Sequence, residues 1–275
     1  MIRRLLIAVA FAVVAAAHAA PPMAPNARNT SAYNDCRTHF TVVVLGSSTA
    51  AGAGAAPVSM SWVNQYNSYL QSISPANKVI DLAVSGYTTY QVLPTGRVPR
   101  ANRPAPDPAH NITSAIALKP NAIILSLPSN DIASGYSLEE AYHNFETIAT
   151  AARVARIPLW VSTPQPRNLT ADKRAQMAQL RAFINRTFGA NALDFMSGYG
   201  TPDGSLLPAY SSDGTHPNNA GHAILFRRVV AAKIPETVCA SLTSRAGRRP
   251  IRLRPAPTTN PHPIGWQGAR KAPAK

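Results

Sequence analysis

Asp213 and His216 lie three residues apart across a glycine turn, in the segment Ser-Asp-Gly-Thr-His-Pro-Asn at residues 212–218. At this spacing the carboxylate can reach one imidazole nitrogen and leave the other free, which gives the orienting acid and the base of a catalytic triad. The same segment also fits a surface turn in which Pro217 opens a helix at a favoured first-turn position. By itself the segment leaves both interpretations open.

Two other polar segments follow apolar runs. Gly46, Ser47 and Ser48 come directly after the β-branched run at 40–45, and a serine at such a turn can act as a nucleophile or simply cap a helix. Asn130 follows the apolar run at 122–127, and its side-chain amide could donate to a developing oxyanion or serve as a turn residue.

The chain alternates between segments typical of strands and segments typical of helices. Short apolar runs predict strands at 40–45, 78–84, 122–127, 158–162 and 191–195. Helical periodicity predicts helices at 59–70, 138–156, 170–188 and 219–233, the second of which follows a capping box at Ser137 and Glu140. The alternation predicts an α/β fold with a mostly parallel five-stranded sheet between two helical layers. In such a sheet the loops at the carboxyl ends of the strands converge, so the polar segments can meet.

Taken together, these segments resemble the SGNH (GDSL-like) hydrolase family, over about residues 40–235. The segment at 46–49 resembles the family's first block, which implies that Ser48 is the nucleophile. The segment at 213–217 resembles the last block, which implies that Asp213 orients His216 and that His216 is the base. The resemblance also implies a flavodoxin-like three-layer fold.

The resemblance further implies an oxyanion hole formed by the Ser48 and Gly86 amides and the Asn130 side chain. Gly86 lies in a Ser-Gly-Tyr segment that resembles the second block, and Asn130 lies in a Ser-Asn-Asp segment that resembles the third. Two positions depart from the family pattern. Ser47 stands where the family often has Asp, which makes Ser47 a competing nucleophile, and Pro128 stands where the third block often has Gly.

We therefore expect a serine esterase that hydrolyses short-acyl esters of carbohydrate, with acetyl as the expected acyl group. The expected substrate contacts come from the loop at 163–168 and from polar and aromatic residues after the second and third strands: Tyr87, Thr88, Tyr90, Gln91 and Asp131. A lysophospholipase or thioesterase acting on lipid esters would use the same residues. A rival from another class is a non-catalytic protein that binds an anionic polymer through its basic tail.

Cofactor and partner expectations are few. The proposed chemistry needs no cofactor and no metal, and the sequence contains neither a phosphate-binding loop nor a cluster of metal ligands. His222, on the last predicted helix, is expected to be structural. We expect a monomer with no specific nucleic-acid partner.

The N-terminus is typical of a secretory signal peptide. Arg3 and Arg4 precede an apolar run at 5–17 that is short for a membrane span, and Ala17 and Ala19 form the small-x-small pattern of a cleavage site. We expect cleavage after Ala19, with a secreted or periplasmic mature protein. A retained membrane anchor is the alternative.

The chain contains two cysteines, Cys36 and Cys239, near the two ends of the predicted domain. Export would place them in an oxidising compartment, where a disulfide persists, so we expect them to be joined. Two unpaired buried thiols are the alternative. Two cysteines alone do not make a zinc site, because such sites take four ligands at close spacing.

The net charge of +15 is unevenly spread. The segment at 243–275 carries eight basic residues and no acidic one, and it is rich in Pro and Ala without apolar periodicity. We expect this tail to be disordered and the body to be only mildly basic. The expected organisation is a signal peptide at 1–19, a flexible lead-in at 20–34, a hydrolase domain at 35–242 and the tail at 243–275.

Overall fold

Five parallel strands form one sheet in the computed structural model, which describes residues 27–127 and 129–246. The strands are β1 Thr41–Gly46, β2 Lys78–Asp81, β3 Ala122–Ser126, β4 Leu159–Ser162 and β5 Ala192–Leu193. Their order across the sheet is β2-β1-β3-β4-β5, with every neighbouring pair parallel. The predicted five-stranded α/β architecture is confirmed. The strand order reverses beside β1, and ligands bind at such a switch point in open α/β sheets.

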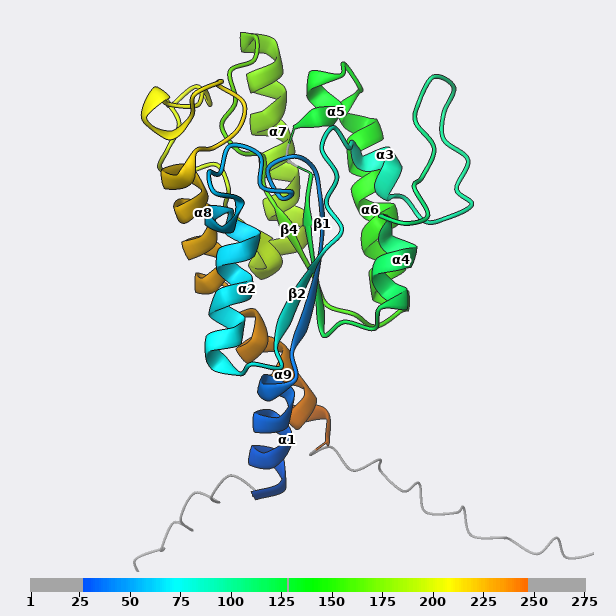
Figure 1. Cartoon of the computed structure of the whole chain (residues 1–275). Coiled ribbons are helices and arrows are strands. Elements are labelled where there is room, and N and C mark those ends of the chain that lie inside the picture. The colour runs from blue at the N-terminus through cyan, green and yellow to red at the C-terminus, as the bar shows by residue number, and fades with distance from the viewer. Residues whose placement is uncertain (1–26, 128, 247–275) are drawn as a thin grey trace, which may run out of the picture.

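Helices cover both faces of the sheet (Figure 1). One layer contains α2 Trp62–Ile73 and α8 Asn219–Ala231, and the other contains α4 Ile112–Ala117, α6 Leu138–Val154 and α7 Ala171–Phe188. The remaining helical segments are α1 Ala27–Thr38, η1 Val58–Met60, α3 Thr89–Val92, α5 Asn130–Ala133, η2 Gly189–Asn191, η3 Pro208–Tyr210 and α9 Ile234–Ala246.

Alternation of side chains along the strands produces two hydrophobic cores. In β1, Val44 packs on the side of α2 and α8, whereas Val43 packs on the side of α6 and α7. Both valines are fully buried, because a parallel sheet covered on two faces leaves neither face to solvent. The predicted capping box also forms: the Ser137 hydroxyl accepts from the Glu140 N–H, and the Glu140 carboxylate accepts from the Ser137 N–H.

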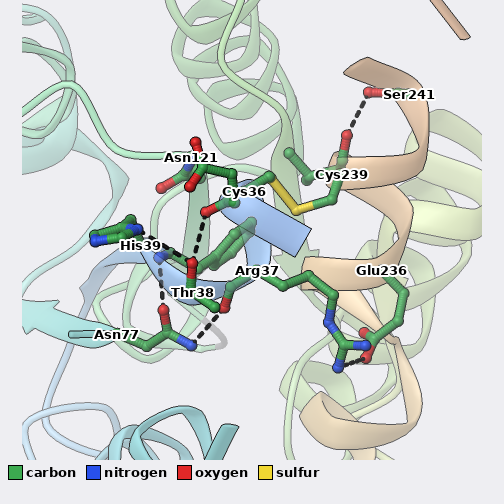
Figure 2. Close-up of a disulfide and its surroundings, with 12 residues drawn as sticks. Cys36, Arg37, Thr38, His39, Asn77, Asn121, Glu236, Cys239 and Ser241 are labelled. Atoms are coloured by element: carbon green, nitrogen blue, oxygen red, sulfur yellow. Dashed lines mark hydrogen bonds and ion pairs between the residues drawn. A yellow bond between two sulfur atoms is a disulfide. The ribbon is translucent and has the colours of Figure 1, made fainter. Parts of the chain in front are cut away.

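A disulfide joins α1 to α9 at the end of the molecule opposite the carboxyl ends of the strands (Figure 1). Cys36 and Cys239 are 203 residues apart in sequence, and their Cα atoms are 5.7 Å apart. Beside the bond, the Arg37 guanidinium donates to the Glu236 carboxylate over 2.9 Å (Figure 2). The predicted pairing of the two cysteines agrees with the structure.

Both predicted edges of the domain need correction. Residues 27–34 belong to α1, although the sequence predicted a flexible lead-in as far as residue 34. A separate helix, α9, follows α8 and continues to Ala246, although the tail was predicted to begin at residue 243. These two helices pack on each other and are held by the disulfide, a long-range contact that local periodicity does not show.

The predicted signal peptide at 1–19 and the basic tail beyond residue 246 lie outside the described residues. None of the helices that the structure describes combines the length and the hydropathy needed to cross a bilayer.

Candidate active site

Loops at the carboxyl ends of three strands and the loop before α8 meet at one edge of the sheet. Ser48 follows β1, Gly86 follows β2, Asn130 begins the short helix after β3, and His216 lies just before α8. The Ser48 Oγ lies 2.9 Å from His216 Nε2. The His216 Nδ1 in turn lies 2.7 Å from the Asp213 carboxylate.

Asp213 is held as an acceptor from several directions. Its Oδ1 accepts from the His216 N–H at 2.7 Å, the Thr215 N–H at 2.8 Å and the Ser211 hydroxyl at 3.1 Å. Partial burial raises the pKa of this carboxyl, but the hydrogen bonds from the His216 backbone and ring and from the Thr215 backbone outweigh burial and hold the pKa below its usual range. An ionised carboxylate only accepts, so the proton of the neutral His216 ring is on Nδ1 and Nε2 is free to accept from Ser48.

The turn after β1 presents Ser48 and keeps Ser47 away from the imidazole. The Ser47 N–H donates to the Ser126 carbonyl at 3.2 Å and its side chain is buried, whereas Ser48 borders open space. Gly46 is required at the start of this turn, because a Cβ there would lie 2.6 Å from the Ala50 Cβ and 2.9 Å from the Ser126 carbonyl oxygen. Of the two candidate nucleophiles, the geometry therefore favours Ser48.

Three N–H donors border the space beside Ser48: the backbone N–H groups of Gly86 and Ser48 and the side-chain amide of Asn130. Gly86 adopts φ +86°, a left-handed conformation that favours glycine, and its N–H has no acceptor among the described residues. The Asn130 Nδ2 donates one hydrogen to the Tyr87 carbonyl at 2.8 Å, which leaves its second hydrogen available. The Ser48 N–H likewise has no acceptor within the described residues.

These groups border a hollow of about 300 Å³. Ala53 has the one wholly apolar side chain among the residues that line it, which are Ser48, Ala53, Ser85, Gly86, Asn130, Arg167, Thr215 and His216. Four of the five residues predicted to act in catalysis or in the oxyanion hole line this hollow. The fifth, Asp213, does not line it and is hydrogen-bonded to His216.

Thr88, Tyr90, Gln91 and Asp131, which the sequence suggested as substrate contacts, are not among the residues that line the hollow. Thr88 and Gln91 form the capping box of α3. The buried Tyr90 hydroxyl donates to Glu140 at 2.7 Å. These side chains serve the local structure.

Asp131 is buried and faces away from the hollow. Its carboxylate accepts from the Thr89 N–H at 3.0 Å and from the Thr89 hydroxyl at 2.5 Å. Tyr87 is half-buried, and its hydroxyl donates to Asp107. Its carbonyl holds Asn130, so Tyr87 serves the site through its backbone.

The loop after β4 contributes more than the sequence indicated. Residues 163–168 were expected at the pocket, but no residue among them was singled out. Gln165 donates to the Thr215 carbonyl at 2.9 Å, and the Asn168 N–H donates to the Gly214 carbonyl at 2.8 Å, so this loop supports the His216 segment. Arg167 donates to the Asn130 Oδ1 at 3.0 Å and lines the hollow.

His222 holds the loop that follows Ser48. Its Nδ1 accepts from the Trp62 N–H at 3.2 Å, and its Nε2 donates to the Ala53 carbonyl at 3.0 Å. Burial lowers the pKa of His222, which keeps the ring neutral as this pairing requires. The structural role predicted for this histidine agrees with these contacts. Across residues 27–127 and 129–246, no group of three or more His, Cys, Asp or Glu side chains is placed to hold a metal.

Comparison with known proteins identifies the family. The model of the GDSL-like lipase/acylhydrolase family matches residues 44–224, which is well over half of the chain. The chain therefore belongs to this family of ester hydrolases, and the resemblance drawn from its sequence blocks is confirmed. A search of curated protein sequences finds no match.

Solved structures share the fold at low sequence identity. A protein of the G-D-S-L lipolytic family from Desulfitobacterium hafniense is 16% identical, with a TM-score of 0.54 over 71% of this chain and 99% of its own. The acetyl xylan esterase AlAXEase is 13% identical, with a TM-score of 0.54 over 70% of this chain and 99% of its own. A GDSL-like lipase from Bacteroides thetaiotaomicron is 17% identical, with a TM-score of 0.50 over 81% and 98%.

Proposed function

We propose that this protein is an exported serine esterase that removes short acyl groups, acetyl above all, from carbohydrate esters. The observation that carries the proposal is the chain of contacts from the Ser48 Oγ to His216 Nε2 at 2.9 Å and from His216 Nδ1 to Asp213 at 2.7 Å. This arrangement links a nucleophile, a base and an orienting carboxylate in the order that acyl transfer needs.

The reaction follows from these contacts. Ser48 Oγ attacks the ester carbonyl while His216 Nε2 takes its proton, and the carbonyl oxygen becomes an oxyanion. The Ser48 and Gly86 N–H groups and the free Asn130 hydrogen donate to that oxyanion. His216 then protonates the leaving alcohol, and the acyl-enzyme is hydrolysed by water that His216 activates in the same way. Asp213 stabilises the imidazolium in both halves.

The lining of the hollow supports a short acyl group. A long acyl chain would need an extended apolar wall, since each buried methylene contributes about 0.8 kcal/mol. The hollow offers Ala53 as its single apolar side chain and is bordered by hydroxyl, amide and guanidinium groups. This favours an acetyl ester of a hydroxylated compound over the lipid esters of a lysophospholipase or thioesterase. The shared fold of an acetyl xylan esterase is consistent with that choice.

Export is supported by the Cys36–Cys239 disulfide, because such bonds persist in oxidising compartments. We propose that the mature enzyme begins after Ala19. Active-site labelling with a fluorophosphonate tests the catalytic proposal directly. The label is expected on Ser48, and wild-type protein that remains unlabelled while folded would favour the non-catalytic rival.

The acyl preference is tested by a series of p-nitrophenyl esters beside acetylated xylan. We expect kcat/KM to fall from acetate to butyrate and further to octanoate. A rise with chain length would support the lipid-ester alternative instead.

A further inference from the structure

We propose that Arg167 makes the hollow selective for esters that carry a carboxylate close to the scissile bond, as acetylated uronic acids do. The inference rests on the proposed function, because it concerns the substrate of the same site. It narrows the substrate class from carbohydrate esters in general to acidic ones.

Arg167 is fixed at the wall of the hollow. Its Nη1 donates to the Ser129 hydroxyl at 3.2 Å and to the Asn130 Oδ1 at 3.0 Å. Its backbone N–H donates to the Gly204 carbonyl at 3.0 Å. The guanidinium therefore occupies one orientation beside the proposed oxyanion donor, so little side-chain entropy remains to be lost when a ligand binds.

The charge of Arg167 has no counterion among the described residues. Both side-chain partners, Ser129 and Asn130, offer neutral oxygens, and no ion pair involves this guanidinium. Asp213 is the acidic group whose charge raises the pKa of Arg167, but the Asp213 carboxylate is already hydrogen-bonded by His216 and Thr215. Half-burial lowers the pKa of Arg167, as expected for a cation that has lost part of its hydration. A ligand carboxylate would compensate that loss.

Donor capacity also remains on the guanidinium. Nη2 makes no hydrogen bond within the described residues. It is also not buried, so it faces solvent. Arginine pairs with carboxylates through short charge-assisted bonds, and Nη2 can donate one without breaking the contact to Asn130. Apart from His216, Arg167 is the single ionisable side chain that lines the hollow. No acidic side chain lines the hollow, so a substrate carboxylate beside Arg167 would meet none there; Asp213 lies behind His216.

A simpler role for Arg167 would be to hold Asn130 alone. The two roles predict different results. A group that only positions the oxyanion donor affects every ester equally, whereas a group that binds a substrate carboxylate affects charged esters more than neutral ones.

The test is a matched pair of aryl acetates, 4-acetoxybenzoate and 4-acetoxybenzamide, which differ in charge and little in shape. The kcat/KM of each is measured for wild type, Arg167→Gln and Arg153→Gln. Arg153 is exposed at the end of α6, away from the hollow, so its replacement changes the net charge equally without touching the site. Comparing the ratio of the two substrates between variants cancels the difference between their leaving groups.

We expect Arg167→Gln to lower kcat/KM for the benzoate about tenfold more than for the benzamide, as fits the loss of one charge-assisted contact. Arg153→Gln should leave the ratio unchanged. Arg167→Lys, which keeps the charge without the planar fork, should fall between wild type and the glutamine variant. If the glutamine variant fails to fold, the lysine variant supplies the same comparison.

An equal loss on both substrates would overturn the inference and leave Arg167 as a positioning residue for Asn130. No loss on either would overturn it as well. Both outcomes leave the proposed esterase function standing, because the benzamide is still hydrolysed by wild type. If wild type hydrolyses neither of these two compounds nor p-nitrophenyl acetate, the proposed function itself is contradicted. On polymers, wild type should release acetate from acetylated polygalacturonate faster than from acetylated xylan, and Arg167→Gln should lose that preference.

Discussion

Asp131 accepts two hydrogen bonds from Thr89, one from its backbone N–H at 3.0 Å and one from its hydroxyl at 2.5 Å. The contact joins the segment after β2, which presents Gly86, to the segment after β3, which presents Asn130. The Thr89 hydroxyl also accepts from Asn144 of α6 at 2.8 Å, so the junction is anchored to a long helix. Two proposed oxyanion donors from different strands are thereby held in one frame.

This junction predicts a pH dependence of stability. Burial raises the pKa of Asp131 to about 6, although the hydrogen bonds from Thr89 oppose the shift. The folded state therefore binds more protons than the unfolded state between about pH 4 and pH 6, so this carboxyl lowers the free energy of unfolding as the pH rises through that window. The loss should be on the order of 2 kcal/mol.

Urea unfolding of wild type and Asp131→Asn at pH 4, 5, 6 and 7 measures the effect. The asparagine side chain does not titrate, so the difference in unfolding free energy, wild type minus variant, should decline across the window. Parallel curves for the two proteins would show that Asp131 does not titrate there.

Replacement of the proposed nucleophile or base should abolish most of the activity. We expect Ser48→Ala and His216→Ala each to lower kcat at least about a thousandfold on p-nitrophenyl acetate, as removal of a triad member generally does. Circular dichroism and melting temperature should stay close to wild type. Ser47→Ala is the matched control, because Ser47 is buried and makes no contact with His216. If Ser47→Ala is the inactive variant, the assignment is wrong by one residue.

Asn130→Ala should reduce turnover more than binding. Loss of one oxyanion donor costs about 2.7–4 kcal/mol, or roughly a hundredfold to a thousandfold in kcat. The KM should change little, because the contact strengthens only as charge develops on the carbonyl oxygen. A loss carried wholly by KM would mean that Asn130 binds the ground-state ester and not the transition state.

Much of this arrangement follows from local signals in the sequence. The buried strands are short apolar runs. The three-residue spacing of Asp213 and His216 across a glycine turn allows the carboxylate to reach the imidazole. Gly46 and Gly86 mark turns that other residues would strain or fill. For these reasons the sheet was predictable, and Ser48, Gly86, Asn130 and His216 do lie together in the structure.

Other features depend on orientation or on distant contacts. Asp131 neighbours Asn130 in sequence, but the short helix α5 points their side chains to opposite sides, one into the core and one into the hollow. The place of Arg167 depends on how the β4 loop folds over Asn130. The helix α1 is stabilised by its packing on α9 more than 190 residues away, so a window of local sequence does not show it.

The disulfide should stabilise the fold without affecting the reaction. It joins α1 to α9 at the end of the molecule opposite the carboxyl end of β1, which Ser48 follows (Figure 1), and its cysteines are 203 residues apart. Cys36→Ser with Cys239→Ser should lower the free energy of unfolding by about 2–5 kcal/mol. The kcat on p-nitrophenyl acetate at 25 °C should match wild type when corrected for the folded fraction. Unchanged stability, or free thiols at both positions in non-reducing peptide maps of wild type, would contradict this.

The corrected end of the domain gives a last prediction, made with two truncations. All proposed catalytic groups lie before Pro217, but α9 continues to Ala246 and contains Cys239. Removal of residues 247–275 should therefore leave both the melting temperature and p-nitrophenyl acetate hydrolysis near wild type. Removal of residues 234–275 should lower the melting temperature, because α1 loses its packing partner and its disulfide.

Comparison of the full-length protein with the form that ends at residue 246 tests whether the basic tail binds anionic surfaces. Seven of its basic residues lie beyond residue 246, and salt screens charge interactions over about 10 Å at 0.1 M ionic strength. Full-length protein should sediment with vesicles that contain anionic lipid, or bind an acidic polysaccharide resin, at roughly 20 mM NaCl. It should be released at roughly 500 mM NaCl, because the screening length between charges is much shorter there. The protein ending at residue 246 should bind weakly at both salt concentrations. Equal binding by the two forms would place the anionic contact on the folded domain. If the protein without residues 247–275 still folds but no longer hydrolyses the ester, the tail contributes to the active site.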